Sequence, residues 1–218
     1  MQIKLDMKIL IFLLIFYITH QIKIYILLMI FACLHELGHL FLGLALGMKP
    51  LCFEIKPIGF SISLKNKVED YNKKILNGNL LELKKIFVYL IGPVVNIICA
   101  SMIFYFNIDV LLKQELIYIN LIIAFVNFLP IYPLDGGRIF KSLVCIFCGL
   151  RRAYALTEKV SFIVMGMVLA VGSMLILKVQ NFGLLIMIFY LAYVKIIETR
   201  KIRNKLRLYK LMEKKQQD

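Results

Sequence analysis

The 218-residue sequence has no tryptophan, only three histidines, and 13 acidic residues against 27 basic ones. It has no stretch rich in glycine, serine and proline that would join separate domains, and no internal repeat. These absences exclude a string of modules on flexible linkers and a repeat architecture. We therefore expect one folded domain, with a short polar loop and a basic C-terminal tail as its only accessories.

Hydrophobic residues make up 61% of the chain, and the mean hydropathy is +0.83. A soluble fold of this length could not bury so much apolar surface, so the composition indicates a polytopic membrane protein. The fold class we predict is all-α, with six transmembrane helices. The expected crossings lie near residues 8–19, 24–46, 86–106, 116–134, 157–177 and 181–197. The first of them is short for a bilayer of about 30 Å.

The net charge of +14 has a topological explanation. When the N-terminus is placed in the cytoplasm, 24 of the 27 lysines and arginines fall on the cytoplasmic side of the six expected spans and 3 fall outside. This asymmetry follows the positive-inside rule and predicts that both termini are cytoplasmic. Because the charge is explained in this way, nucleic acid is not expected as a partner.

The second expected span contains the stretch His35-Glu36-Leu37-Gly38-His39. Charged and imidazole groups are costly in hydrocarbon, so they usually face protein or water and mark a functional site. On a helix His35 and His39 share one face and can bind a zinc ion, while Glu36 lies beside them and can accept a proton from water. A pair of structural histidines is the alternative, and a third ligand would decide between the two.

Residues 51–64 alternate β-branched and aromatic residues with polar ones, with a turn expected at Pro57 to Gly59. We predict a short β-hairpin at the membrane edge, followed by a polar loop over residues 65–85 in which Asn77-Gly78 marks a turn. An unpaired hairpin edge can accept an extended peptide as a further strand. An ordinary interfacial hairpin explains the pattern equally well.

Two later segments place polar groups at membrane depth. Asn96 follows Gly92-Pro93, where the glycine allows close approach of a neighbouring backbone and the proline frees a carbonyl. Asn127 precedes Pro130 and Pro133, which break the fourth expected span just before Asp135-Gly136-Gly137. A helix end with Asp135 as the cap of the next segment explains the Asp-Gly-Gly sequence, but not Asn127 or the two prolines.

Two residues are candidates for the third zinc ligand. Glu54 lies 15 residues after His39, in the predicted strand. Asp135 comes from the fourth expected span, which runs in the same direction as the second and therefore brings Asp135 toward the same half of the membrane as His39. We favour Asp135 over Glu54.

With these residues in view, the sequence resembles the site-2 protease family of intramembrane zinc metalloproteases, peptidase family M50. Three motifs of that family stand in order over residues 24–140, and they are His35-Glu36-Leu37-Gly38-His39, Gly92-Pro93-Val94-Val95-Asn96, and Asn127-Phe128-Leu129-Pro130 with Pro133-Leu134-Asp135-Gly136-Gly137. The resemblance is greatest to a sporulation branch of the family. It sets the expected domain limits at 1–198 for the protease and 199–218 for a basic cytoplasmic tail, without a CBS or PDZ domain.

The resemblance implies one Zn²⁺ per chain on His35, His39 and Asp135, with Glu36 as general base. It also implies that Asn127 and Asn96 position the substrate, and that the segment around Phe53, Ile55 and Phe60 holds an extended peptide.

The expected partners are the lipid bilayer and a membrane-associated protein substrate in a bacterial cell membrane, namely the pro-form of sigma factor K in the sporulation branch. A single-span anti-sigma factor or a signal-peptide remnant is the alternative substrate. A membrane-protein inhibitor or activator and a homo-oligomer are left open. The rival from another class is a transporter or scaffold in which zinc is cargo or structural.

Overall fold

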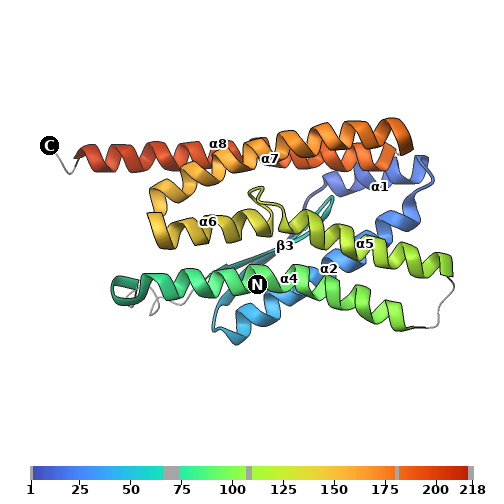
Figure 1. The fold of residues 1–218 in the computed structure, drawn as a ribbon, viewed down its shortest axis with the longest axis horizontal. Coiled ribbons are helices and arrows are strands. Elements are labelled where there is room, and N and C mark those ends of the chain that lie inside the picture. Colours follow the sequence, from blue (N-terminus) through green and yellow to red (C-terminus); the bar gives the residue numbers. More distant parts are fainter. Residues whose placement is uncertain (1, 66–73, 107–109, 180–181, 216–218) are drawn as a thin grey trace. The chain divides into compact units, whose positions relative to one another are not determined.

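The computed structural model describes the chain except for residues 1, 66–73, 107–109, 180–181 and 216–218. It divides into two compact units, Met1–Phe128 and Leu129–Asp218. The first unit contains β1 Gln2–Leu5, α1 Lys8–Ile18, α2 Ile22–Ala45, β2 Lys49–Lys56, β3 Gly59–Lys65, α4 Lys74–Tyr105 and α5 Val110–Phe128 (Figure 1). The second contains α6 Asp135–Cys148, α7 Leu150–Val179 and α8 Phe182–Lys215.

The first unit is built on three apolar helices. α2 and α5 begin at the same end, because Lys23 near the start of α2 lies 2.7 Å from the carboxylate of Glu115 near the start of α5. α4 packs against both of them. It runs antiparallel to α2, since His39 contacts Val88 and the earlier His35 contacts Asn96. The alternating directions are those expected of consecutive membrane crossings.

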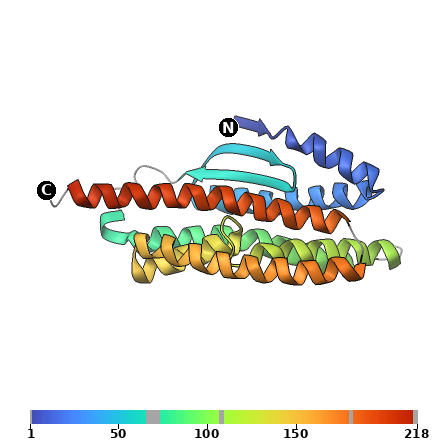
Figure 2. The same cartoon turned by 90° about the horizontal axis from the view of Figure 1, so that it is seen from above.

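A three-stranded sheet in the order β1-β2-β3 packs against α2 (Figure 2). The predicted hairpin is confirmed: β2 and β3 are antiparallel, and Lys56 pairs with Gly59 across the tight turn. Gly59 has φ +98°, a conformation that a side chain disfavours. The strand β1 was not predicted, and it pairs in parallel with β2, so that one edge of the hairpin is already occupied.

The prediction of a polar loop over residues 65–85 is wrong for residues 74–85, which are helical. α4 begins at Lys74, so Asn77 and Gly78 are helical rather than a turn. Part of the expected loop, residues 66–73, lies outside the described residues. The helix begins before the apolar run that follows residue 85. Charged residues there stabilise it, because Glu82 and Lys85 are three positions apart on one helix face and their charged atoms lie 2.6 Å apart.

Six membrane crossings are not confirmed. Among the described residues, the helices long and apolar enough to cross a membrane are Ile22–Ala45, Asn79–Tyr105, Val110–Phe128 and Leu150–Met174. α1 has 11 residues and spans about 16 Å, which is too short for a hydrocarbon core of about 30 Å. The sixth expected crossing begins at residue 181, outside the described residues, and α8 is not one of these four helices.

The fourth expected crossing ends earlier than predicted. α5 stops at Phe128, and residues 129–134 form an irregular connection to α6. In the second unit this connection folds back over the start of α6: a Cβ at Gly137 would lie 2.4–2.6 Å from the backbone of Ile131 and Tyr132. The space that Gly137 leaves is therefore filled by the preceding backbone.

Candidate active site

The two histidines of α2 lie buried against α4, with exposed fractions of 3% for His35 and 5% for His39. Their rings are 4.8 Å apart between centroids and nearly perpendicular, at 84°. Both imidazoles come from one helix face because the residues are four apart, which is one helical turn. The sequence prediction of a shared face is borne out by this geometry.

Each histidine uses its Nδ1 atom for a contact with α4. Nδ1 of His39 lies 2.6 Å from the backbone carbonyl oxygen of Val88. Since a carbonyl can only accept, His39 donates its Nδ1 proton, which leaves the lone pair of the neutral ring on Nε2. Nδ1 of His35 lies 3.0 Å from Oδ1 of Asn96.

The Nε2 atoms of both histidines converge over Gly92. A Cβ atom at this position would lie 2.5 Å from Nε2 of His39 and 2.6 Å from Nε2 of His35. A residue with any side chain would therefore fill the space that both ring nitrogens face. Two nitrogens presented to a shared space, with Nδ1 turned to an acceptor, match the way in which proteins arrange histidines for a metal.

His39 does not use the carbonyl that Pro93 was expected to free. Pro93 has no N–H to donate to the carbonyl of Tyr89, which interrupts the regular helix bonding there. The carbonyl that His39 contacts is that of Val88, which directly precedes Tyr89.

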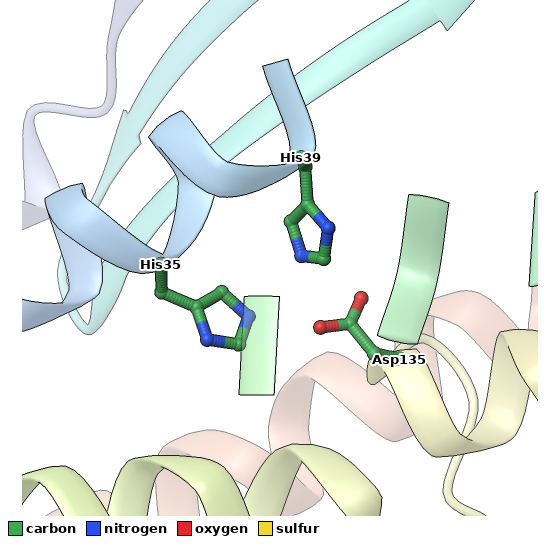
Figure 3. Close-up of side chains that lie close together, drawn as sticks. All are labelled: His35, His39 and Asp135. Carbon is green, nitrogen blue, oxygen red and sulfur yellow. The ribbon is translucent and has the colours of Figure 1, made fainter. Parts of the chain in front are cut away.

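Asp135 belongs to the second unit, where it is the first residue of α6 and is 5% exposed. Ser161 of α7 stabilises the connection that precedes it: the hydroxyl donates to the carbonyl of Pro130 at 3.1 Å and accepts from the N–H of Tyr132 at 2.9 Å. His35 and His39 of the first unit and Asp135 of the second are buried side chains of types that bind metal ions, and Figure 3 labels all three.

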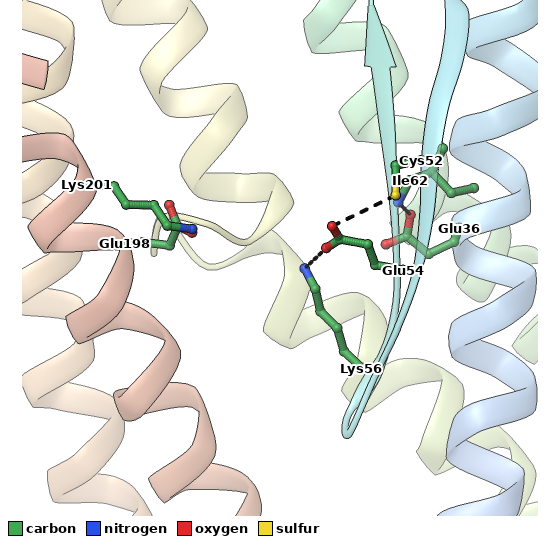
Figure 4. A network of polar contacts seen from close by, with 7 residues as sticks. All are labelled: Glu36, Cys52, Glu54, Lys56, Ile62, Glu198 and Lys201. Carbon is green, nitrogen blue, oxygen red and sulfur yellow. Dashed lines mark hydrogen bonds and ion pairs between the residues drawn. The ribbon is translucent and has the colours of Figure 1, made fainter. Parts of the chain in front are cut away.

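Glu36 projects from α2 toward the sheet, and its Oε2 atom accepts the backbone N–H of Ile62 at 3.1 Å (Figure 4). Ile62 is opposite Phe53 in the register, at a position where the backbone groups of β3 point away from β2. The carboxylate is therefore held at the outer edge of β3, one residue along the helix from His35.

Glu54, the other candidate third ligand, lies on β2 opposite Ser61. Its carboxylate is 3.6 Å from the ammonium group of Lys56 and 4.0 Å from the thiol of Cys52, and its side chain is 36% exposed (Figure 4).

The residues expected to hold a peptide share one face of the sheet. Phe53 and Phe60 have ring centroids 5.5 Å apart, and Ile55 is directly opposite Phe60 in the register. Because cross-strand partners project to the same side, these three side chains and Ile62 form an apolar face, while Cys52, Glu54 and Ser61 project to the other side.

The two asparagines predicted to position the substrate, Asn96 and Asn127, lie in different environments. Asn96 is 1% exposed and bridges His35 to Asn120 of α5, a residue that the sequence reasoning missed. Asn127 donates its amide to the carbonyl of Ile123 at 3.0 Å, four residues earlier on α5. Asn120 carries the same signal as Asn96, a polar amide in an apolar span.

Three comparisons relate this chain to known proteins. The model of peptidase family M50 matches residues 109–172. The fold is similar to that of the site-2 protease from Methanocaldococcus jannaschii, with a TM-score of 0.63, 20% sequence identity, and coverage of 90% of each chain. No curated protein matches the sequence significantly.

The chain therefore shares its fold with a site-2 protease, and in this fold two histidines lie on one face of α2. The family match and the shared fold confirm the resemblance to the site-2 protease family that the three motifs predicted.

Proposed function

We propose that this protein is an intramembrane zinc endopeptidase that cleaves a membrane-associated regulatory protein. The observation that carries the proposal is the convergence of Nε2 of His35 and Nε2 of His39 over the bare Cα of Gly92. With two nitrogens committed to one space, one further ligand and a position for water or substrate complete a catalytic zinc site. Asp135, a buried carboxylate, is the third ligand in this proposal.

The donor set fits zinc, since two imidazoles and a carboxylate are ligands that Zn²⁺ accepts in catalytic sites. When bound, zinc supplies Lewis acidity, which polarises the scissile carbonyl and lowers the pKa of water toward about 7. Glu36 accepts the proton of the attacking water and donates it to the leaving amide nitrogen.

The peptide substrate lies along β3 in this proposal. The N–H of Ile62, which faces outward from the sheet, is the group that Glu36 contacts. A peptide added as a strand at this edge would therefore run past the general base. Since β1 occupies the other edge of the sheet, β3 is the edge that we assign to the substrate. Phe53, Ile55 and Phe60 supply the apolar face for its side chains.

The two asparagines take separate roles. Asn96 accepts a hydrogen bond from His35 in the arrangement described above, so we assign it to the orientation of that ligand rather than to the substrate. Asn127 is assigned to the substrate backbone or to the oxyanion that develops during cleavage.

The substrate that we propose is the pro-form of sigma factor K. This finer assignment is supported by the resemblance of the sequence to stage IV sporulation protein FB. We assign the enzyme to a bacterial membrane that surrounds the developing spore, with both termini in the cytoplasm, as the distribution of basic residues over the six expected spans predicts.

The test is co-expression of a tagged sigma-factor precursor with the wild type or with Glu36→Gln. We expect cleavage by the wild type and at least about a 100-fold loss with Glu36→Gln, because the amide cannot take up the proton. Full activity of Glu36→Gln would contradict the role of Glu36. If neither enzyme cleaves the precursor while the wild type binds zinc, the substrate assignment is wrong, and a single-span anti-sigma factor is the next substrate to test.

The third ligand is tested by zinc content after purification. We expect stoichiometric zinc in the wild type and in Glu54→Ala, and loss of zinc in Asp135→Ala. Zinc retained by Asp135→Ala and lost by Glu54→Ala would reverse the assignment.

A further inference from the structure

Asn120, in the middle of α5, has a side chain with no exposed surface. Its Nδ2 donates to the backbone carbonyl of Leu116 at 2.9 Å, and its Oδ1 accepts from Nδ2 of Asn96 at 3.4 Å. Asn96 in turn contacts Nδ1 of His35 at 3.0 Å. The four residues form a buried chain of hydrogen bonds from the backbone of α5, through α4, to a histidine of α2.

The carbonyl of Leu116 fixes the direction of this chain. An amide side chain has a donating end and an accepting end, and a carbonyl can only accept. The NH₂ group of Asn120 must therefore face Leu116, which turns its oxygen toward Asn96. The NH₂ group of Asn96 donates to that oxygen, and the oxygen of Asn96 therefore faces His35.

The last member of the chain is thereby given a defined tautomer. Since the oxygen of Asn96 can only accept, His35 must donate its Nδ1 proton, and the lone pair of the neutral ring is on Nε2. Nε2 is the atom that faces the space over Gly92. With the amide of Asn96 reversed, Nδ1 would have to accept, and Nε2 would carry the proton instead of the lone pair.

We propose that Asn120 is a positioning residue for zinc: acting through Asn96, it holds His35 in the tautomer and ring orientation that present Nε2 to the metal. This inference deepens the proposed function and rests on it. Asn120 touches neither the metal nor the substrate. Partners of this kind around a metal site typically change metal affinity by about 10–100-fold when they are removed.

The experiment measures zinc affinity of the purified full-length protein by competition with a chromogenic chelator. Asn120→Leu keeps the branching of the side chain but removes both of its hydrogen bonds, and we expect zinc to bind about 10–100-fold more weakly. The control is Ser101→Ala. Ser101 is an exposed residue of α4 that makes the same kind of bond, to the carbonyl of Ile97 four residues earlier at 2.9 Å, and we expect its replacement to leave zinc affinity unchanged.

A rescue variant separates positioning from a general effect on folding. In Asn96→Asp either carboxylate oxygen accepts the hydrogen bond from Nδ1 of His35, so this side chain needs no partner to set its direction. We therefore expect Asn96→Asp with Asn120→Leu to bind zinc within about threefold of Asn96→Asp alone. Rescue would not occur if Asn120 acted only by packing.

The outcomes distinguish this inference from the proposed function. If the wild type binds no zinc, the proposed function fails. If the wild type binds zinc and Asn120→Leu binds it equally well, only the role of Asn120 is overturned. Weaker binding by Asn120→Leu that Asn96→Asp does not restore also overturns it, because the effect then does not pass through Asn96.

Discussion

Gly92 sets the sharpest single-residue constraint on the candidate site. In most helices glycine is replaced by alanine at a gain of about 1 kcal/mol, because alanine has the higher helix propensity. At Gly92 a Cβ would instead lie 2.5–2.6 Å from Nε2 of both histidines. The intrinsic preference of the helix and the requirement of the site are therefore opposed at this residue.

We expect Gly92→Ala to fold and to lose zinc, because its methyl group would occupy the space that the two ring nitrogens face. The matched control is Gly166→Ala on α7, where no atom among the described residues lies within 4 Å of the added Cβ. Zinc content and thermal unfolding of both variants provide the measurement. Stoichiometric zinc in Gly92→Ala would show that the metal does not use this space.

The chemistry-bearing residues could be found from sequence, but their partners only in part. His35, Glu36 and His39 are conspicuous because polar groups are rare in an apolar span. Asn120 carries the same signal and was still missed. The acceptor for His39 is the backbone carbonyl of Val88. Every residue has such a carbonyl, so the residue type does not show which one accepts the hydrogen bond.

At the scale of the elements, periodicity predicted helices and the hairpin, whereas boundaries and long-range pairing were less accessible. The start of α4 at Lys74 was hidden by the polar composition of its first turns. β1 has four residues, and its pairing with β2 depends on a partner about 50 positions away in the sequence. Alternation within such a short strand carries little information.

The connection between α5 and α6 yields a prediction for Ser161. Ser161→Ala removes the group that bonds both Pro130 and Tyr132, and each buried backbone group left without a partner costs about 1–3 kcal/mol. We expect a lower thermal unfolding midpoint and weaker zinc binding, since Asp135 follows this connection directly.

Ser173→Ala is the control for Ser161→Ala. Ser173 lies on the same helix, is exposed, and bonds locally to the carbonyl of Ala170 at 2.8 Å, so its loss should leave the unfolding midpoint nearly unchanged. Equal effects of the two serine variants would mean that the connection does not depend on Ser161.

For the whole molecule, the apolar composition and the four long apolar helices among the described residues indicate an integral membrane protein. Six crossings were expected because hydropathy counts apolar residues without measuring how far a helix extends. α1 illustrates this: its residues are strongly apolar, but its 11 residues are too few to cross.

The cytoplasmic orientation predicts the side from which thiols can be labelled. Cys148 is exposed at the end of α6, on the side that the charge distribution makes cytoplasmic. In a variant with Cys148 as its single cysteine, a membrane-impermeant thiol reagent should label inside-out vesicles and not intact cells. A second variant lacks all five native cysteines and carries Val110→Cys at the exposed first residue of α5, and it should show the reverse. Labelling of Cys148 from outside would invert the topology.

Both histidines are ultimately oriented by main-chain oxygen atoms, that of Val88 directly and that of Leu116 through two amides. Main-chain oxygens are the same in every amino acid, so positions 88 and 116 are free to drift to other helix-forming residues without loss of the acceptor. Positions 92, 96 and 120 have no such freedom. In a set of related sequences we therefore expect residue type to be conserved at positions 92, 96 and 120 but variable at positions 88 and 116, although all five positions contribute to the site.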